Sequence, residues 1–157
     1  MSLTAAKLDY ETNYEDALAV VLAAALSGVQ ILTPRTLLSS APILTTPRVT
    51  IGLQVTGTNP NQQATDTTSG LYDAHKLGVF TLAATVRRDG TGQSLGTLRG
   101  GIRLALLKGA TALNATNLPN YQTITLREQG SAMSPGAEND EITCQLNYAV
   151  EFYVIPG

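Results

Sequence analysis

The most regular pattern in the chain lies near its C-terminal end and reads Ile142-Thr143-Cys144-Gln145-Leu146-Asn147-Tyr148-Ala149-Val150-Glu151-Phe152-Tyr153-Val154. Apolar side chains occupy every second position, which predicts a strand with one buried face. At ~3.3 Å per residue it would span roughly 40 Å, whereas the usual strand has about 5–6 residues. We therefore expect it to extend beyond its own domain and to need a partner subunit for its far end, unless a bulge or sharp bend interrupts it.

Four further segments have strand-like patterns. Arg48–Thr56 and Lys76–Val86 alternate between apolar and polar residues, Tyr121–Glu128 is shorter, and Val29–Leu32 would be an edge strand. The apolar faces of the two alternating strands comprise Val49, Ile51, Leu53 and Val55 in the first and Phe80, Leu82, Ala84 and Val86 in the second. These strands would contribute to the same sheet as the C-terminal strand.

Two segments have the spacing of amphipathic helices. Tyr14–Leu26 is preceded by Asn13, a favourable N-cap residue, and followed by Gly28, which can adopt a left-handed conformation. The second helix is expected to run from Ser94 as its cap to about Lys108. The core-facing residues would be Leu18, Leu22 and Leu26 in the first helix and Leu95, Leu98, Ile102 and Leu106 in the second. Arg99 and Arg103 would point outward, and Gly100-Gly101 predicts close backbone packing or a kink.

The order helix, strands, helix, strands predicts an α+β fold, with a mostly antiparallel sheet flanked by two helices. The 157 residues fit a single structural domain, 1–157. Two polar stretches, 57–70 and 129–140, are expected to be long exposed loops. The proline-containing segment 32–46 has no assigned place in this plan.

Composition excludes several classes of function. Apolar residues make up 43% and charged residues 14% of the chain, which is not typical of disorder. The net charge of −2 provides no basic field for nucleic acid or an anionic membrane. The apolar run Ala17–Leu26 is about half of what a bilayer requires, and acidic residues precede it, so we expect a soluble, cytosolic-type chain without membrane association.

The chain lacks an assembled catalytic or metal-binding motif. His75 and Cys144 are its single histidine and its single cysteine, which excludes a multi-histidine or cysteine-based metal site. We expect His75, two residues from Asp73, to be a loop or strand-edge residue without a catalytic role, and Cys144 to be buried and inert. The glycine-rich stretch Gly90–Gly96 has Gln93 where a phosphate-binding loop needs lysine. We therefore expect no enzymatic activity, no cofactor and no metal.

Charged residues fall into two clusters. Basic charge gathers around the second helix and acidic charge at Glu138-Asn139-Asp140-Glu141, which has no calcium-loop spacing. The acidic cluster is either a solvated loop end or half of a contact between subunits, and the basic helix suits an acidic neighbouring subunit better than nucleic acid. The candidate interface residues are Arg87, Arg88, Arg99 and Arg103 together with Tyr148, Val150, Phe152 and Val154.

The layout of the whole chain resembles the tail-terminator (tail-completion) proteins of long-tailed bacteriophages and phage-like particles. The resemblance rests on the helix Tyr14–Leu26, the strand opening Pro47-Arg48-Val49-Thr50-Ile51, the unit Leu77–Lys108 and the ending Glu138–Ile142 before a long strand. It implies a virion structural protein of the tail or neck, assembled in the host bacterial cytoplasm. Such a protein forms a ring, usually a hexamer, that caps the tail tube and joins it to the head.

The resemblance also implies the partners: further copies of the same chain, neighbouring neck and tail-tube proteins, and genomic DNA that passes through the ring without sequence-specific binding. Two alternatives remain open from the sequence. One is another neck, tube or baseplate subunit of the same particle. The more distant one is a small-ligand-binding or enzymatic α+β domain, which a stable monomer with a deep closed pocket would favour.

Overall fold

The computed structural model describes residues 4–35, 46–57, 75–88, 93–116, 118–135 and 140–155. Its strands are β1 (Gln30–Leu32), β2 (Arg48–Gly57), β3 (His75–Arg87), β4 (Tyr121–Pro135) and β5 (Glu141–Val154). Its helices are α1 (Ala5–Leu8), α2 (Tyr10–Ala25), α4 (Gln93–Ala105) and α5 (Ala110–Asn114). The sheet order is β1-β2-β3-β5-β4, in which β1 and β2 are parallel and the other neighbours antiparallel. This arrangement confirms the predicted α+β fold.

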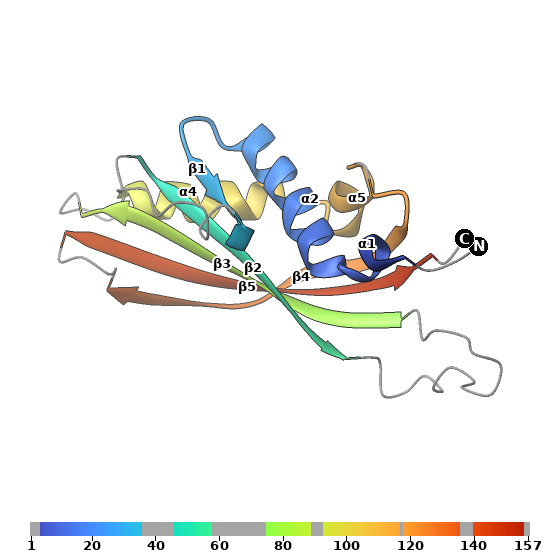
Figure 1. Ribbon diagram of the computed structural model, residues 1–157. Helices are drawn as coiled ribbons and strands as arrows, with labels where there is room; N and C mark the ends of the chain where they lie inside the picture. Colours follow the sequence, from blue (N-terminus) through green and yellow to red (C-terminus); the bar gives the residue numbers. More distant parts are fainter. Residues whose placement is uncertain are drawn as a thin grey trace.

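The helices cover one face of the twisted sheet, and no helix among the described residues covers the opposite face (Figure 1). Strand alternation directs one side-chain set of each strand toward the helices, where the core forms. The predicted apolar faces of β2 and β3 point this way: Val49, Ile51, Phe80, Leu82, Ala84 and Val86 are buried, while Leu53 and Val55 are partly buried. The helices contribute Leu18, Leu22, Leu95, Leu98, Ile102 and Leu106 to the same core.

Aromatic side chains fill one end of this core. The ring of Tyr14 lies 4.4 Å from that of Phe152 and 5.4 Å from that of Tyr121, in tilted and edge-on geometries. Each such pair contributes about 0.5–1.5 kcal/mol beyond area burial. The Tyr14 hydroxyl lies 2.8 Å from Oγ1 of Thr123, and burial raises the pKa of Tyr14 well above its usual value. The cluster fixes α2 against β4 and β5.

The first long helix begins earlier than the sequence pattern suggests. α2 starts at Tyr10, and its N-cap is Asp9, whose carboxylate oxygen accepts from the Thr12 N–H. Asn13, the predicted cap, is inside the helix, and its side-chain amide donates to the backbone carbonyls of Ala6 and Asp9. The prediction of Asn13 as cap was wrong because Asp9 is an equally good cap residue and the earlier start brings Tyr10 onto Phe152.

Small residues allow close packing where α2 ends and α4 passes. Gly28 has φ +72°, in the left-handed region predicted for it after the helix. At Gly101 a Cβ atom would lie 2.8 Å from Cδ2 of Leu26, and at Gly100 it would meet nothing within 4 Å, so the glycine pair makes one tight side-chain contact rather than the close backbone packing that the sequence suggested. α4 begins at Gln93, one residue before the predicted cap Ser94, and ends at Ala105. Leu106, although beyond the helix, remains buried.

β4 is much longer than predicted, and this changes the role of β5. β4 runs to Pro135, so the predicted loop 129–140 is strand over 129–135, and 136–139 lie outside the described residues. β5 pairs with β3 from His75 to Arg87 and with β4 from Tyr121 to Pro135. The expectation that β5 needs a partner subunit was therefore wrong: both of its sides are paired within the chain.

The full length of β4 could not be predicted from the alternation of its residues, because its register shifts twice, between Thr123 and Thr125 and between Glu128 and Gly130. Each bulge adds one residue and exchanges the faces of all later side chains. Period-two alternation is therefore lost. The predicted loop 57–70 beyond Gly57, the part of segment 32–46 from 36 to 45, and residues 89–92 lie outside the described residues.

Candidate functional site

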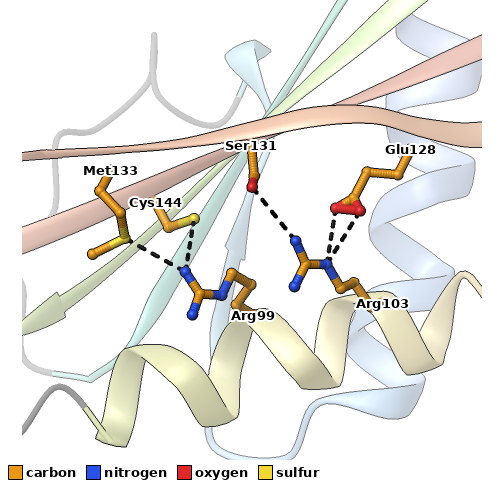
Figure 2. Close-up of polar contacts among 6 residues, drawn as sticks. All are labelled: Arg99, Arg103, Glu128, Ser131, Met133 and Cys144. Atoms are coloured by element: carbon orange, nitrogen blue, oxygen red, sulfur yellow. Dashed lines mark hydrogen bonds and ion pairs between the residues drawn. The ribbon is translucent and has the colours of Figure 1, made fainter.

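The side of α4 that faces β4 carries two arginines. Arg99 and Arg103 are four residues apart and therefore share one side of the helix. Figure 2 shows both guanidinium groups directed at the strands. Nη1 of Arg99 lies 3.6 Å from Sδ of Met133 and 3.9 Å from Sγ of Cys144. The prediction that these arginines point outward was wrong, because β4 extends beneath them.

Arg103 forms the stronger of the two attachments. Its Nε donates to both carboxylate oxygens of Glu128, at 2.8 and 3.2 Å, and Nη2 lies 3.5 Å from Oγ of Ser131. The hydrogen bond to Glu128 raises the pKa of Arg103 above its usual value. The pair is solvent-accessible, with side chains 43% and 30% exposed, so it contributes only about 0.2–1 kcal/mol.

Arg87, the last residue of β3, and Arg88 after it bind the residues at the start of β5. The guanidinium of Arg87 forms an ion pair with Asp140, and Nε of Arg88 donates to the Glu141 carbonyl at 3.3 Å. The backbone N–H of Arg88 also donates to the Asp140 carbonyl, at 2.7 Å. Within the acidic cluster predicted to be either solvated or intersubunit, Asp140 thus pairs with a basic residue of its own chain, while residues 138 and 139 lie outside the described residues. All four predicted interface arginines contact the β4–β5 hairpin of their own chain.

The four apolar residues predicted at the subunit interface have a different place. Tyr148, Val150, Phe152 and Val154 are at most 3% exposed and belong to the core beneath the helices. A partner subunit cannot reach them in the folded chain. This part of the interface prediction was wrong because these side chains lie on the face of β5 that packs into the core.

On the outer edge of β4, the backbone groups have hydrogen-bond partners or close neighbours among the described residues only along the first part of the strand. The side-chain amide of Asn114, from α5, donates to the Thr123 carbonyl and its oxygen accepts from the Thr123 N–H, both at 2.9 Å. It thereby occupies both edge-facing groups of Thr123, as a neighbouring strand would. Gly109, with φ +59°, lies so close to Leu126 that a Cβ would be 2.9 Å from the Leu126 oxygen. Among the described residues no backbone group outside β5 pairs with β4 beyond that point.

On the outer edge of β2, too, only some of the backbone groups have a partner among the described residues. β1 pairs with Arg48, Val49 and Thr50 and then ends. Three residues further along, Oε2 of Glu15 accepts from the Leu53 N–H at 2.9 Å, so a helix side chain replaces the missing strand at this position. Burial raises the pKa of Glu15. Neither Asn114 nor Glu15 was identified from the sequence, since no local pattern marks a side chain that pairs with a distant strand.

The sheet face without helices presents mainly uncharged polar side chains along its middle. Thr85 and Thr143 lie 2.9 Å apart through their hydroxyl oxygens, and Thr81 Oγ1 donates to Asn147 Oδ1 at 3.4 Å. Gln145 Nε2 also approaches Asn147 Oδ1, at 3.3 Å. The contacts of Thr81 with Asn147 and of Thr85 with Thr143 link β3 to β5 across this face.

The described residues bring no nucleophile and base together. His75 is the first residue of β3, is buried, and its Nε2 lies 2.7 Å from Oε1 of Glu151 rather than beside Asp73, which is outside the described residues. His75 pairs in register with Tyr153 at one end of β5, while Cys144 is near the other end. Cys144 is fully buried.

The described part of the chain also offers no metal site and no membrane-spanning helix. It contains no cluster of three or more potential metal-binding side chains, and none of its helices is long and apolar enough to cross a membrane. A groove of about 560 Å³ lies between the end of α2 and α4, and its described lining includes Leu26, Ser27, Ser94 and Thr97 but no ionisable side chain. The described geometry offers edges and surfaces for contact rather than a reaction centre.

The fold and these surfaces define an α+β domain with one helix-covered sheet face and two partly open sheet edges. No protein-family model and no curated protein matches the chain. A solved chain from the virion of a native gene transfer agent particle is similar, with a TM-score of 0.53, 11% identity, and coverage of 93% of this chain and 94% of that one. A second solved chain is similar with a TM-score of 0.52, 12% identity, and coverage of 99% and 100%. At these identities the likeness establishes the fold.

Proposed function

We propose that this protein is a structural subunit of a phage-like virion. The observation that carries the proposal is the likeness to a chain of a gene transfer agent virion over nearly the full length of both chains. The layout of the sequence resembles tail-terminator proteins, which agrees with this. The contact surfaces described above, without a reaction centre among the described residues, also support a protein that acts by association rather than as an enzyme.

More specifically, the protein would form a ring, hexameric by the resemblance, at the junction of tail tube and head. Its partners would be copies of itself and the adjoining neck and tube proteins, and the genome would pass through the ring without being read. The small net charge of −2 supports the last point, because a strongly basic lumen would hold the DNA backbone. Assembly would take place in the bacterial cytoplasm before the particle leaves.

The proposal is tested in cells that produce the particle. Peptide mass spectrometry of purified particles is expected to find this chain as a stoichiometric component. After deletion of the gene, heads and tails should accumulate as separate parts, because the ring is proposed to lie between them, and a plasmid copy should restore joined particles. Its absence from purified particles, together with normal particles from the deletion strain, would contradict the proposal.

A further inference from the structure

The open part of β4 can be assigned residue by residue. In an antiparallel pair, alternate residues direct both backbone groups away from the partner. Thr123, opposite Phe152, does so, since Asn114 binds both of its groups. Beyond Thr123, the β4 residues opposite the same alternate set of β5 are Leu126, Glu128, Ser131, Met133 and Pro135. Beyond Leu126, the outward N–H groups of β4 are therefore those of Glu128, Ser131 and Met133, since proline has none.

The open part of β2 follows from the same alternation. The Leu53 N–H points outward, to Glu15, so the backbone groups of Val55 point outward as well. β1 ends opposite Thr50, and no other described segment pairs with β2 beyond it on this edge. On the outer edge of β2, the backbone groups from the Leu53 carbonyl to Gly57 therefore have no backbone partner among the described residues.

The two open segments complement each other. They lie on opposite edges of the sheet, since the order is β1-β2-β3-β5-β4. Three successive antiparallel pairings separate β2 from β4, so the two strands run in opposite directions. A second molecule that continues the sheet in the same orientation would therefore place its β2 antiparallel to the β4 of the first. Such a contact joins different surfaces and can repeat around a ring.

Apolar surface lies beside the β4 segment. Met133, on the helix-facing side of β4, is 52% exposed. A neighbouring molecule placed against this edge would cover this side chain. Edge pairing alone supplies few hydrogen bonds, so additional apolar burial is needed to make the contact stable.

We propose that the β4 segment Glu128–Met133 of one molecule pairs, antiparallel, with the open edge Leu53–Gly57 of β2 in a second copy of this chain. The inference rests on the proposed function in that it names the contact between neighbouring subunits of the ring. Asn114 at Thr123 and Glu15 at Leu53 then mark where the paired segments begin. The pairing is head-to-tail, so each molecule uses both edges.

The experiment uses one proline variant for each edge. Met133→Pro removes the outward N–H of β4, and Met133→Ala is its matched control, because it shortens the side chain but keeps the N–H. Val55→Pro and Val55→Ala form the corresponding pair on β2. Circular dichroism checks the folding of each, and sedimentation velocity measures association. Wild-type protein is expected to associate. Each alanine control should associate more weakly because it loses apolar side-chain surface, and each proline variant alone should remain a monomer.

Mixing the two proline variants distinguishes head-to-tail pairing from other geometries. Val55→Pro retains the β4 segment and Met133→Pro retains the β2 edge, so the mixture should form a one-to-one dimer and nothing larger. Association of Val55→Pro with itself would instead indicate that β4 pairs with β4, and it would overturn the proposal. So would a monomeric wild-type protein, or a Met133→Pro variant that associates like wild type.

A measurement without substitutions covers the case in which a proline variant does not fold. Hydrogen exchange of the wild-type amides of Ser131, Met133 and Val55 is compared at high and low protein concentration. The inference expects at least tenfold slower exchange at high concentration at these three positions, and equal rates would contradict it. Association through these edges in a chain that is absent from particles would sustain the inference and contradict only the proposed function.

Discussion

Glu15 shows how a single side chain closes part of a sheet edge. In the structure it lies well inside α2, is 8% exposed, and accepts from the Leu53 N–H of β2. The bond satisfies a backbone donor that β1 is too short to reach.

Substitutions at Glu15 separate its acceptor role from its charge. Burial raises the pKa of Glu15 from 4.5, so the folded chain holds this proton more firmly than the unfolded chain does. The contribution of this group to the free energy of unfolding should therefore fall as the pH rises from about 4.5 through the raised pKa. Glu15→Gln keeps an acceptor oxygen without charge, and should remove this dependence and leave stability at pH 7 equal or higher.

Glu15→Ala leaves the Leu53 N–H without its acceptor and should lower the free energy of unfolding by about 1–3 kcal/mol. Urea denaturation of the three proteins at pH 4 and pH 7 measures both effects. Equal losses for the glutamine and alanine variants at pH 7 would show that the acceptor oxygen is not what matters.

Among the elements, those with uninterrupted periodicity were predictable and those with shifted register were not. β3 and β5 are paired without a register shift, β2 has one only after Val55, and the core residues of α2 and α4 keep helical spacing, so these elements and their buried faces could be predicted. β4 carries two bulges, which remove the alternation after Thr123 and Glu128. The second half of β4, which pairs with residues 142–147 of β5, could therefore not be predicted.

The short helix α5 supplies a partner for the outer edge of β4. Its five residues end with Asn114, whose side chain pairs with both edge-facing groups of Thr123. Because this pairing depends on a contact across the fold, no sequence pattern indicates it. α5 therefore determines where the open part of β4 begins.

Asn114→Ala is expected to lower the free energy of unfolding by about 1–2 kcal/mol, because a donor and an acceptor of a buried residue lose their partner. Asn114→Asp retains the acceptor for the Thr123 N–H but not the donor, and should show a smaller loss. Hydrogen exchange should place the increased opening at the Thr123 amide. Unchanged exchange at Thr123 in the alanine variant would refute the role of Asn114.

For the molecule as a whole, the prediction of association through a sheet edge is kept, but it now applies to other strands. β5 is interior, while β4 and β2, on opposite edges of the sheet, each have a segment whose outer edge no other described residue pairs with. The arginines expected to contact a neighbour instead hold the β4–β5 hairpin from α4 and β3. Charge reversal at Arg99 and Arg103 would therefore disturb the chain's own hairpin.

A three-dimensional reconstruction of the intact particle tests whether the protein is a subunit of a ring. The account predicts a closed ring between head and tail tube, built of copies of this five-stranded sheet with its helices on one face. Neighbouring copies should be in contact, and an open channel should run along the ring axis. A complete reconstruction of head, neck and tail in which no density fits this fold would contradict it.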